Sequence, residues 1–103
     1  MKSQSVANIR AVIAYIEAHL SEKLDLAKVS KAAGYSKYHL HRMFSQTVGM
    51  TVNDYIRRRR LTEAAKLLVF SQKPILEIAL IAGYESQQAF SGIFKAMYKQ
   101  TPL

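Results

Sequence analysis

The sequence predicts an all-α fold of six to seven helices, arranged as two helix-turn-helix subdomains joined by a long linker helix. Three observations support this fold class. Apolar residues recur at helical spacing through most of the 103 residues. No stretch alternates as a strand would, and no Asn-Gly hairpin signal occurs. The segment around Ala33-Gly34-Tyr35 is repeated around Ala82-Gly83-Tyr84.

The first half of the chain contains three predicted helices. The first covers about residues 6–20, and its apolar stripe consists of Ile9, Ile13, Ile16 and Leu20. Asp25 can cap a short second helix that stops at Gly34, and Ser36 can cap a third that ends near Gly49. The apolar side of this third helix consists of Leu40, Met43, Phe44 and Val48.

The second half begins with a capping box at Thr51, in which Asp replaces the usual Glu, and this box opens the linker helix. Pro74 suits the first position of a short helix that closes at Gly83. The last helix starts at Glu85 or Ser86, and its apolar side consists of Phe90, Ile93, Phe94 and Met97. The predicted organisation is an N-terminal helix-turn-helix subdomain (1–51), a linker helix (52–71) and a C-terminal helix-turn-helix subdomain (72–103).

The internal repeat carries most of the functional argument. Beyond the glycine turn, Leu40 pairs with Phe90 and Phe44 with Phe94. Each copy has a short helix, a turn with Gly and a longer helix, which is the plan of a motif whose second helix enters the DNA major groove. One such hairpin is a weak signal, because any pair of helices can imitate it. Two copies in register are a much stronger signal.

The charge balance indicates an anionic partner. Fifteen Lys and Arg outnumber seven Asp and Glu, which gives a net charge of +8, and both halves share the excess. Charge alone leaves nucleic-acid binding and an ordinary basic surface equally open. The absence of Cys excludes a disulfide framework, and no apolar run approaches the roughly 20 residues of a membrane span. We expect a cytoplasmic, nucleoid-associated protein without membrane contact.

The outer side of each second helix presents side chains suited to base edges. The candidate base-reading residues are Tyr38, His41, Arg42, Ser45 and Gln46 in the first copy and Gln87, Gln88, Ser91 and Gly92 in the second. Arg can bond guanine through two donors, and Gln matches adenine. Every surface helix has a polar side, but neither of these sides contains an acid, which favours DNA reading over a merely solvated face. His39 lies at the apolar border and is expected to pack.

Gly92 stands where the first copy has Arg42, so the second helix lacks this guanine reader. Either the backbone approaches the duplex closely at Gly92, or the second half-site is read weakly. The sequence favours weak reading.

The candidate phosphate contacts are Lys28, Lys31, Lys37, Arg59, Lys95 and Lys99. The run from Arg57 to Arg60 looks like a phosphate clamp, but a helix spreads four consecutive residues around its whole axis. At most two of the four can touch DNA. Arg57 and Arg60 can instead snorkel or pair with an acid such as Asp54.

The linker helix has a length that suits DNA. It contains no Gly or Pro, and some 20 residues span about 30 Å. Successive major-groove faces lie about 34–36 Å apart. The helix can therefore hold two reading helices one turn apart on an asymmetric site that a monomer occupies, and some bending of the DNA is expected.

Three segments together, GYSKYHLHRMF, YIRRRRLTEAAKLL and GYESQQAFSGIFK, resemble the DNA-binding domain of the AraC/XylS family of bacterial transcription regulators, in the branch of MarA, SoxS and Rob. The resemblance covers about residues 9–102. It implies homeodomain-like three-helix units, an activator bound to promoter double-stranded DNA, and recruitment of RNA polymerase. The base-reading positions of the family fall on Tyr38, His41, Arg42, Gln87, Gln88, Ser91 and Gly92.

This sequence departs from the branch in three respects. Members usually carry Trp at Tyr38, Gln at His41 and Arg at Gly92, so the target site does not transfer. The family pattern continues beyond Leu103, so we expect a fragment without the last helix. The domain stands first in the chain, which suggests that a C-terminal effector domain is missing.

Two other function classes compete with DNA reading. An enzyme is disfavoured, because no nucleophile–base pair, carboxylate pair or phosphate loop occurs. His39 and His41 lie about 200° apart on a helix and cannot chelate one metal. We therefore expect no catalytic residue, metal or cofactor. The stronger alternative is a basic helical adaptor that contacts RNA polymerase without sequence readout of its own.

Overall fold

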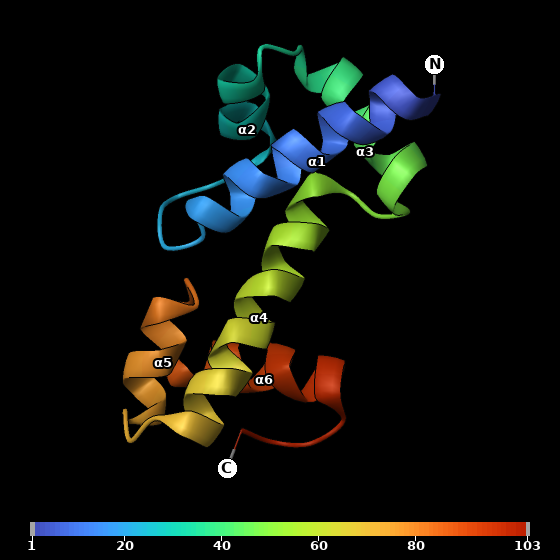
Figure 1. The fold of residues 1–103 in the computed structure, drawn as a ribbon. Helices are drawn as coiled ribbons and strands as arrows, with labels where there is room; N and C mark the ends of the chain where they lie inside the picture. The colour runs from blue at the N-terminus through green and yellow to red at the C-terminus, as the bar shows by residue number, and fades with distance from the viewer. Residues whose placement is uncertain (1, 103) are drawn as a thin grey trace. The chain divides into compact units, whose positions relative to one another are not determined.

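The computed structural model describes residues 2–102, with side chains from Val6 onward, and this part of the chain contains helices but no strand (Figure 1). The helices are α1 (Lys2–Ala18), α2 (Leu26–Ala33), α3 (Lys37–Val48), α4 (Val52–Phe70), α5 (Ile75–Ile81) and α6 (Gln87–Tyr98). The all-α prediction is confirmed, with six helices over the described range. No helix in that range is long and apolar enough to cross a membrane.

The chain divides into two compact units, and the boundary falls between Arg57 and Arg58. This boundary lies inside α4, so the first turns of α4 belong to one unit and the remaining turns to the other. The sequence analysis had instead set the linker helix apart from both subdomains. Each unit contains one copy of the repeat and is described by itself.

In the first unit, α1 packs against α2 and α3 and encloses a core that also takes in the start of α4 (Figure 1). Its buried residues are Ile9, Val12, Ile16, Val29, Leu40, Met43, Phe44, Val52 and Ile56. The predicted apolar sides of the first and third helices supply most of this core. Burying one such large side chain contributes about 1.5–3 kcal/mol.

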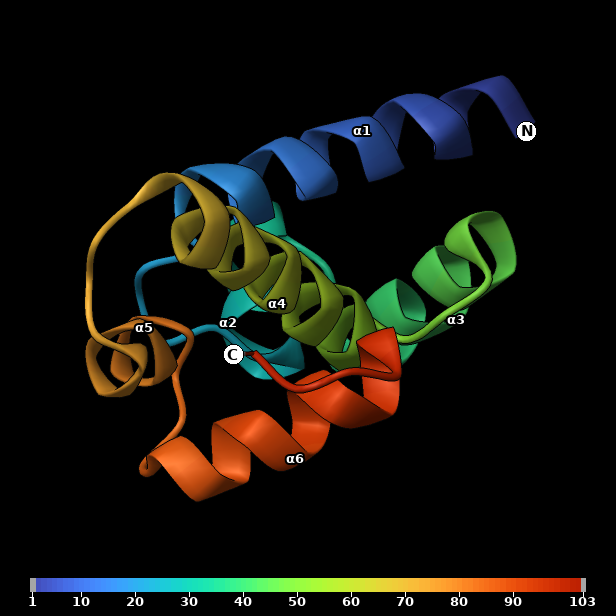
Figure 2. The same cartoon turned by 90° about the horizontal axis from the view of Figure 1, so that it is seen from below.

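In the second unit, α5 and α6 pack against each other and against the C-terminal turns of α4 (Figure 2). Its buried residues are Leu61, Ala64, Ile78, Ala79, Ala82, Phe90 and Phe94. Ile93 and Met97 are only partly buried at the edge of this core. The second half of α4 therefore plays the part that α1 plays in the first unit.

The two helix-turn-helix turns have the same backbone hydrogen bonds. Gly34 has φ 80°, and the next residue, Tyr35, donates its N–H to the carbonyl of Ser30 at 2.9 Å. Gly83 has φ 93°, and Tyr84 donates to the carbonyl of Ala79 at 3.0 Å. Glycine suits both turns because a positive φ strains residues that carry a Cβ.

Ser caps follow both turns, as predicted for Ser36 and as one of two alternatives for Ser86. The Ser36 Oγ accepts from the His39 N–H at 3.1 Å, and the Ser86 Oγ accepts from the Ala89 N–H at 3.0 Å. The second turn has one additional residue, Glu85, which explains why the repeat changes its offset at this point.

Some predicted helix ends shift by a few residues. The first helix begins at Lys2 rather than near residue 6 and ends at Ala18. Pro74 is the N-cap of α5 and not its first helical residue, because its ψ of 151° is extended. The Thr51 Oγ1 accepts from the Asp54 N–H at 3.0 Å, which is the first half of the predicted capping box.

Candidate nucleic-acid interface

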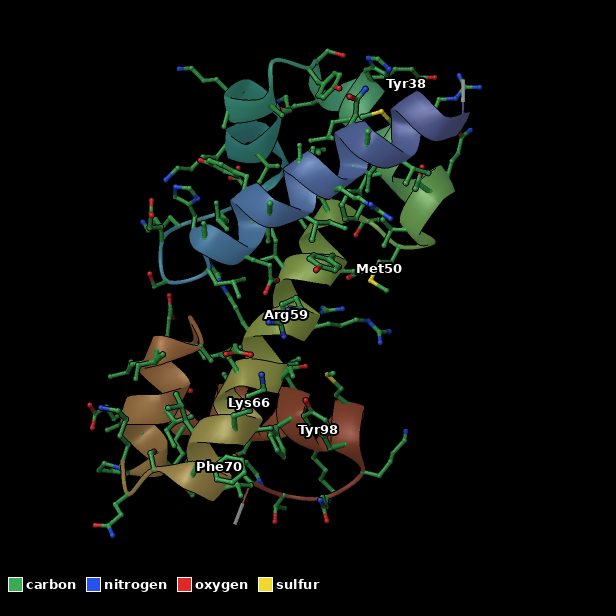
Figure 3. The ribbon with its side chains drawn as sticks, viewed as in Figure 1. Tyr38, Met50, Arg59, Lys66, Phe70 and Tyr98 are labelled. Atoms are coloured by element: carbon green, nitrogen blue, oxygen red, sulfur yellow. The ribbon has the colours of Figure 1, made fainter. Side chains whose placement is uncertain are left out.

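The outer side of α3 presents most of its candidate reading residues to solvent. Tyr38 is 72% exposed and projects from the start of α3 (Figure 3). His41, Arg42 and Gln46 are also exposed. Among the described residues, none forms a hydrogen bond or ion pair with the Arg42 guanidinium. Its donors are therefore available to an outside partner such as guanine.

Ser45 is the exception on α3. Its Oγ is buried and has no hydrogen-bond partner within the described part of the chain. A hydroxyl that is shielded from solvent cannot reach a base edge, so this conformation does not offer the contact predicted for Ser45. The sequence placed Ser45 on the outer side with the other candidates, whereas packing of α3 within the unit shields its hydroxyl.

His39 was expected to pack, but it is exposed. Its ring meets the Tyr35 ring edge to face, with centroids 5.2 Å apart. Together with five neighbours on α3, it lines an open hollow of about 390 Å³. The residues around this hollow are Tyr38, His39, Arg42, Met43, Gln46 and Thr47. Thr47 was not among the sequence candidates and His39 was assigned to packing, although both lie within one turn of Arg42 or Gln46.

The outer side of α6 presents shorter side chains than the outer side of α3. Gln87, Gln88 and Gly92 are exposed, while Ser91 is half-buried. A Cβ added at Gly92 would meet no heavy atom within 4 Å in the described structure. The second helix therefore presents two glutamines near its N-terminus and bare backbone one turn later.

The acids of the chain are mostly engaged elsewhere. Glu22 lies 3.7 Å from the Lys28 ammonium, Asp25 accepts the Lys28 N–H at 2.8 Å, and Glu77 pairs with Lys73 at 3.2 Å. Lys28 is thus the one predicted lysine with a neighbouring carboxylate among the described residues. The exposed lysines without a described ion pair are Lys31, Lys37, Lys95 and Lys99.

The arginines of α4 divide into paired and free side chains. Arg57 donates to Asp54 at 2.8 Å, which confirms the pairing expected for this residue. Arg59 donates to Glu63 at 3.2 Å, and its side chain is only 25% exposed, so it is a poorer phosphate contact than predicted (Figure 3). Arg58 is exposed and has no ion pair within the described residues. Sequence analysis overlooked it, although the spacing of Arg59 and Glu63 indicated a helical ion pair.

Glu63 is held by two cations on α4. The Lys66 ammonium lies 3.0 Å from its Oε2, and the Arg59 guanidinium lies 3.2 Å from the same oxygen. The hydrogen bond from Lys66 is the largest cause that lowers the pKa of Glu63 below its ordinary value. Burial opposes it, and the hydrogen bond from Arg59 and the charges of both cations lower the pKa further. The carboxylate remains charged at neutral pH and neutralises part of this face of α4.

Comparisons with known proteins agree with this geometry. A family model described as a helix-turn-helix domain matches residues 29–103. The transcriptional regulator Rob of Salmonella typhimurium is 45% identical over 94 residues, which make up 91% of this chain and 32% of Rob. The regulatory protein SoxS of Escherichia coli K12 is 44% identical over 94 residues, 91% of this chain and 88% of SoxS. This chain thus spans about a third of the length of Rob and most of SoxS.

Solved structures give the same result. An AraC-type regulator from Chromobacterium violaceum has a TM-score of 0.89 at 28% identity, covering 97% of this chain and 89% of its own. The DNA-binding domain of AdpA, solved in complex with a target DNA, has a TM-score of 0.83 at 26% identity, covering 90% of this chain and 84% of its own. Two exposed reading helices, cations without acid partners and these relatives point to one conclusion. The chain belongs to the AraC-type family of helix-turn-helix DNA-binding domains.

Proposed function

We propose that this chain serves a transcription regulator and binds an asymmetric promoter site as a monomer, with α3 and α6 in successive major grooves. The observation that carries the proposal is the pair of exposed, acid-free outer sides on α3 and α6, which belong to different units and carry different side chains. The unbroken helix α4 supports it, because 19 residues extend about 28 Å. That length is close to one turn of B-DNA.

A binding-site selection followed by a salt titration tests this proposal. The selected duplex should contain two unlike half-sites about one helical turn apart. If the protein neutralises 6–10 phosphates, its affinity should fall about 10³–10⁵-fold between 50 and 200 mM salt. Selection of no preferred sequence would contradict the proposal, as would a palindromic site occupied by two copies.

We further propose that the regulator activates transcription through a contact with RNA polymerase, made away from the reading helices. The outer side of α5 supports such a contact. Leu76, Leu80 and Ile81 are about half exposed there, at 49%, 55% and 48%. Large apolar side chains exposed close together on a short helix are typical of protein-binding surfaces, and they offer nothing to phosphate.

Replacing Leu80 with Asp tests this contact. We expect transcription from the selected promoter to fall in a reconstituted assay, while affinity for the same duplex is unchanged. The matched control is Glu77→Gln on the same side of α5, which should leave both quantities unaltered. Full activation by the Leu80→Asp protein would contradict a polymerase contact on this side.

A basic adaptor that contacts polymerase without reading DNA is the second candidate, and the exposed side of α5 is the observation that favours it. It predicts equal affinity for all duplexes in the selection. The proposal includes no catalytic step, places the protein in the bacterial cytoplasm at the nucleoid, and allows a further effector domain, as the length of Rob illustrates.

A further inference from the structure

Gly92 occupies the interior of α6, four residues after Gln88 and three before Lys95. Glycine in a helix interior is less stable than alanine, because it gains more conformational freedom on unfolding. Despite this, α6 is continuous from Gln87 to Tyr98. The position therefore carries a cost in stability that the helix does not require.

Packing within the protein does not account for this glycine. Gly92 is exposed, and a Cβ built on it would meet no described heavy atom within 4 Å. Its φ also lies outside the left-handed region that favours glycine. Within the described structure, alanine would fit at this position without displacing a neighbour, so contacts inside the protein do not require the glycine.

Gly92 also lies on the reading side of α6. Gln88, Gly92 and Lys95 follow one another at spacings of four and three, so they share one side of the helix. In the first copy, the equivalent position holds the exposed Arg42. The reading side of α6 therefore has no side chain at the position where the reading side of α3 has the long side chain of Arg42.

We propose that Gly92 is a specificity-determining residue that lets the α6 backbone close on the C5 methyl group of a thymine. This inference rests on the proposed function. Bare backbone at a helix surface offers no side-chain donor, and the thymine methyl is the apolar group that base pairs present in the major groove. Gln88, one turn earlier, matches the N6 and N7 groups of adenine. The α6 half-site is thus read as A·T pairs, whereas Arg42 selects guanine in the α3 half-site.

Replacing thymine by uracil in the DNA tests the inference, because uracil lacks only the methyl group. The experiment uses the full chain, the Gly92→Ala variant and the selected duplex, with each thymine of the α6 half-site replaced in turn. We expect Gly92→Ala to bind the thymine duplex about tenfold more weakly than the wild type, a loss within the range of one mismatched pair. At one uracil position the difference between the two proteins should disappear.

Two outcomes would overturn the inference. One is equal affinity of Gly92→Ala and wild type for the thymine duplex. The other is a loss that is the same with thymine and uracil at every position. The thermal midpoint of Gly92→Ala should match or exceed that of the wild type, which excludes misfolding as the cause of weaker binding.

Arg42→Ala on the same duplexes separates this inference from the proposed function. If Arg42→Ala loses its preference at one guanine while Gly92→Ala behaves as wild type, only the thymine contact fails. If neither variant changes sequence preference and all duplexes bind equally, sequence-specific reading fails as a whole.

Discussion

The two units of this protein share one backbone plan but present different reading surfaces. Their glycine turns and Ser caps form the same hydrogen bonds within a few tenths of an ångström. On the outer sides, however, the two helices differ. Where α3 carries His41 and Arg42, the equivalent positions of α6 carry Ser91 and Gly92. Local hydrogen bonds and apolar packing therefore preserve the motif, while the solvent-facing positions are free to diverge toward different half-sites.

The two units also differ at their helix ends. Asp25 caps α2 through a side-chain bond, whereas Pro74 at the start of α5 makes none. Gly49 ends α3 with φ 87°, but Lys99 ends α6 with φ 61°. A residue with a Cβ is strained in this region, so α6 carries a cost at its C-terminus that α3 avoids.

Different reading surfaces matter only if both units read DNA at the same time, and an insertion in α4 tests whether they do. Four helix-forming residues placed between Arg57 and Arg58 would turn the second unit by about 40° and move it about 6 Å. Specific affinity should fall at least about 100-fold, because several base contacts worth about 1–3 kcal/mol each would be lost. Gel-shift titration with the selected duplex measures the loss.

The insertion falls at the boundary between the units, so it interrupts neither core. Helical content should rise slightly, and chemical denaturation should show no loss of stability. Unchanged specific affinity in a folded insertion variant would show that α4 does not set the spacing of the two readers.

Replacing Arg42 with Ala should produce the next largest effect. We expect a cost of about 1–3 kcal/mol at a single base pair of the α3 half-site, because a bidentate guanine contact is lost. Gln88→Ala is the matched change in the other unit and should relax one adenine position of the α6 half-site. Competition binding over all single-base variants of the site measures both. Uniform weakening on every variant would show that Arg42 contacts the backbone instead.

Exchanging the residues that end the two reading helices should shift stability in opposite directions. Lys99→Gly should raise the free energy of unfolding by about 1 kcal/mol, and Gly49→Lys should lower it by a similar amount. Lys99→Gly should also weaken DNA binding equally on all sequences and reduce the salt slope by about 1. Lys99→Asn is the control for the effect of backbone strain on stability, because Asn tolerates a positive φ. A stabilised Lys99→Gly protein with unaltered salt slope would remove Lys99 from the phosphate contacts.

Replacing Glu63, which forms ion pairs with two cations of α4, should produce the smallest change in stability. The pKa of Glu63 is lower in the folded protein than in the unfolded chain. The ion pairs of Glu63 therefore stabilise the folded protein at pH values above the unfolded-state pKa. This stabilisation is lost as the pH falls through the folded-state pKa. Glu63→Gln should therefore be slightly less stable than wild type at pH 7 and equal to it in strong acid. Denaturation at both pH values measures this, and a difference that persists in acid would contradict the linkage.

The same variant tests the phosphate contact predicted for Arg59. Loss of the carboxylate would remove this ion pair from the Arg59 guanidinium, so DNA affinity should rise if Arg59 can reach a phosphate. No change in affinity at low salt would leave Arg58 as the better candidate on α4.

Most of the fold could be predicted from the sequence, because its signals are local. Asp25, Ser36, Gly34 and Gly83 mark helix ends through hydrogen bonds and φ angles that involve residues within five positions. The candidate reading surfaces could be predicted for a similar reason. Helical periodicity separates the inward Leu40 and Phe44 from the outward residues without reference to the rest of the chain.

Local signals in the sequence predict the helices, their caps and which side of each helix is apolar, since these depend on residues within about one turn. The packing of the helices, in contrast, buries the Ser45 hydroxyl, leaves His39 exposed and sets the boundary between the units inside α4. Residues at the margin of a helical side are shielded or exposed according to which neighbouring helix packs there. Periodicity within one helix contains no information about that neighbour.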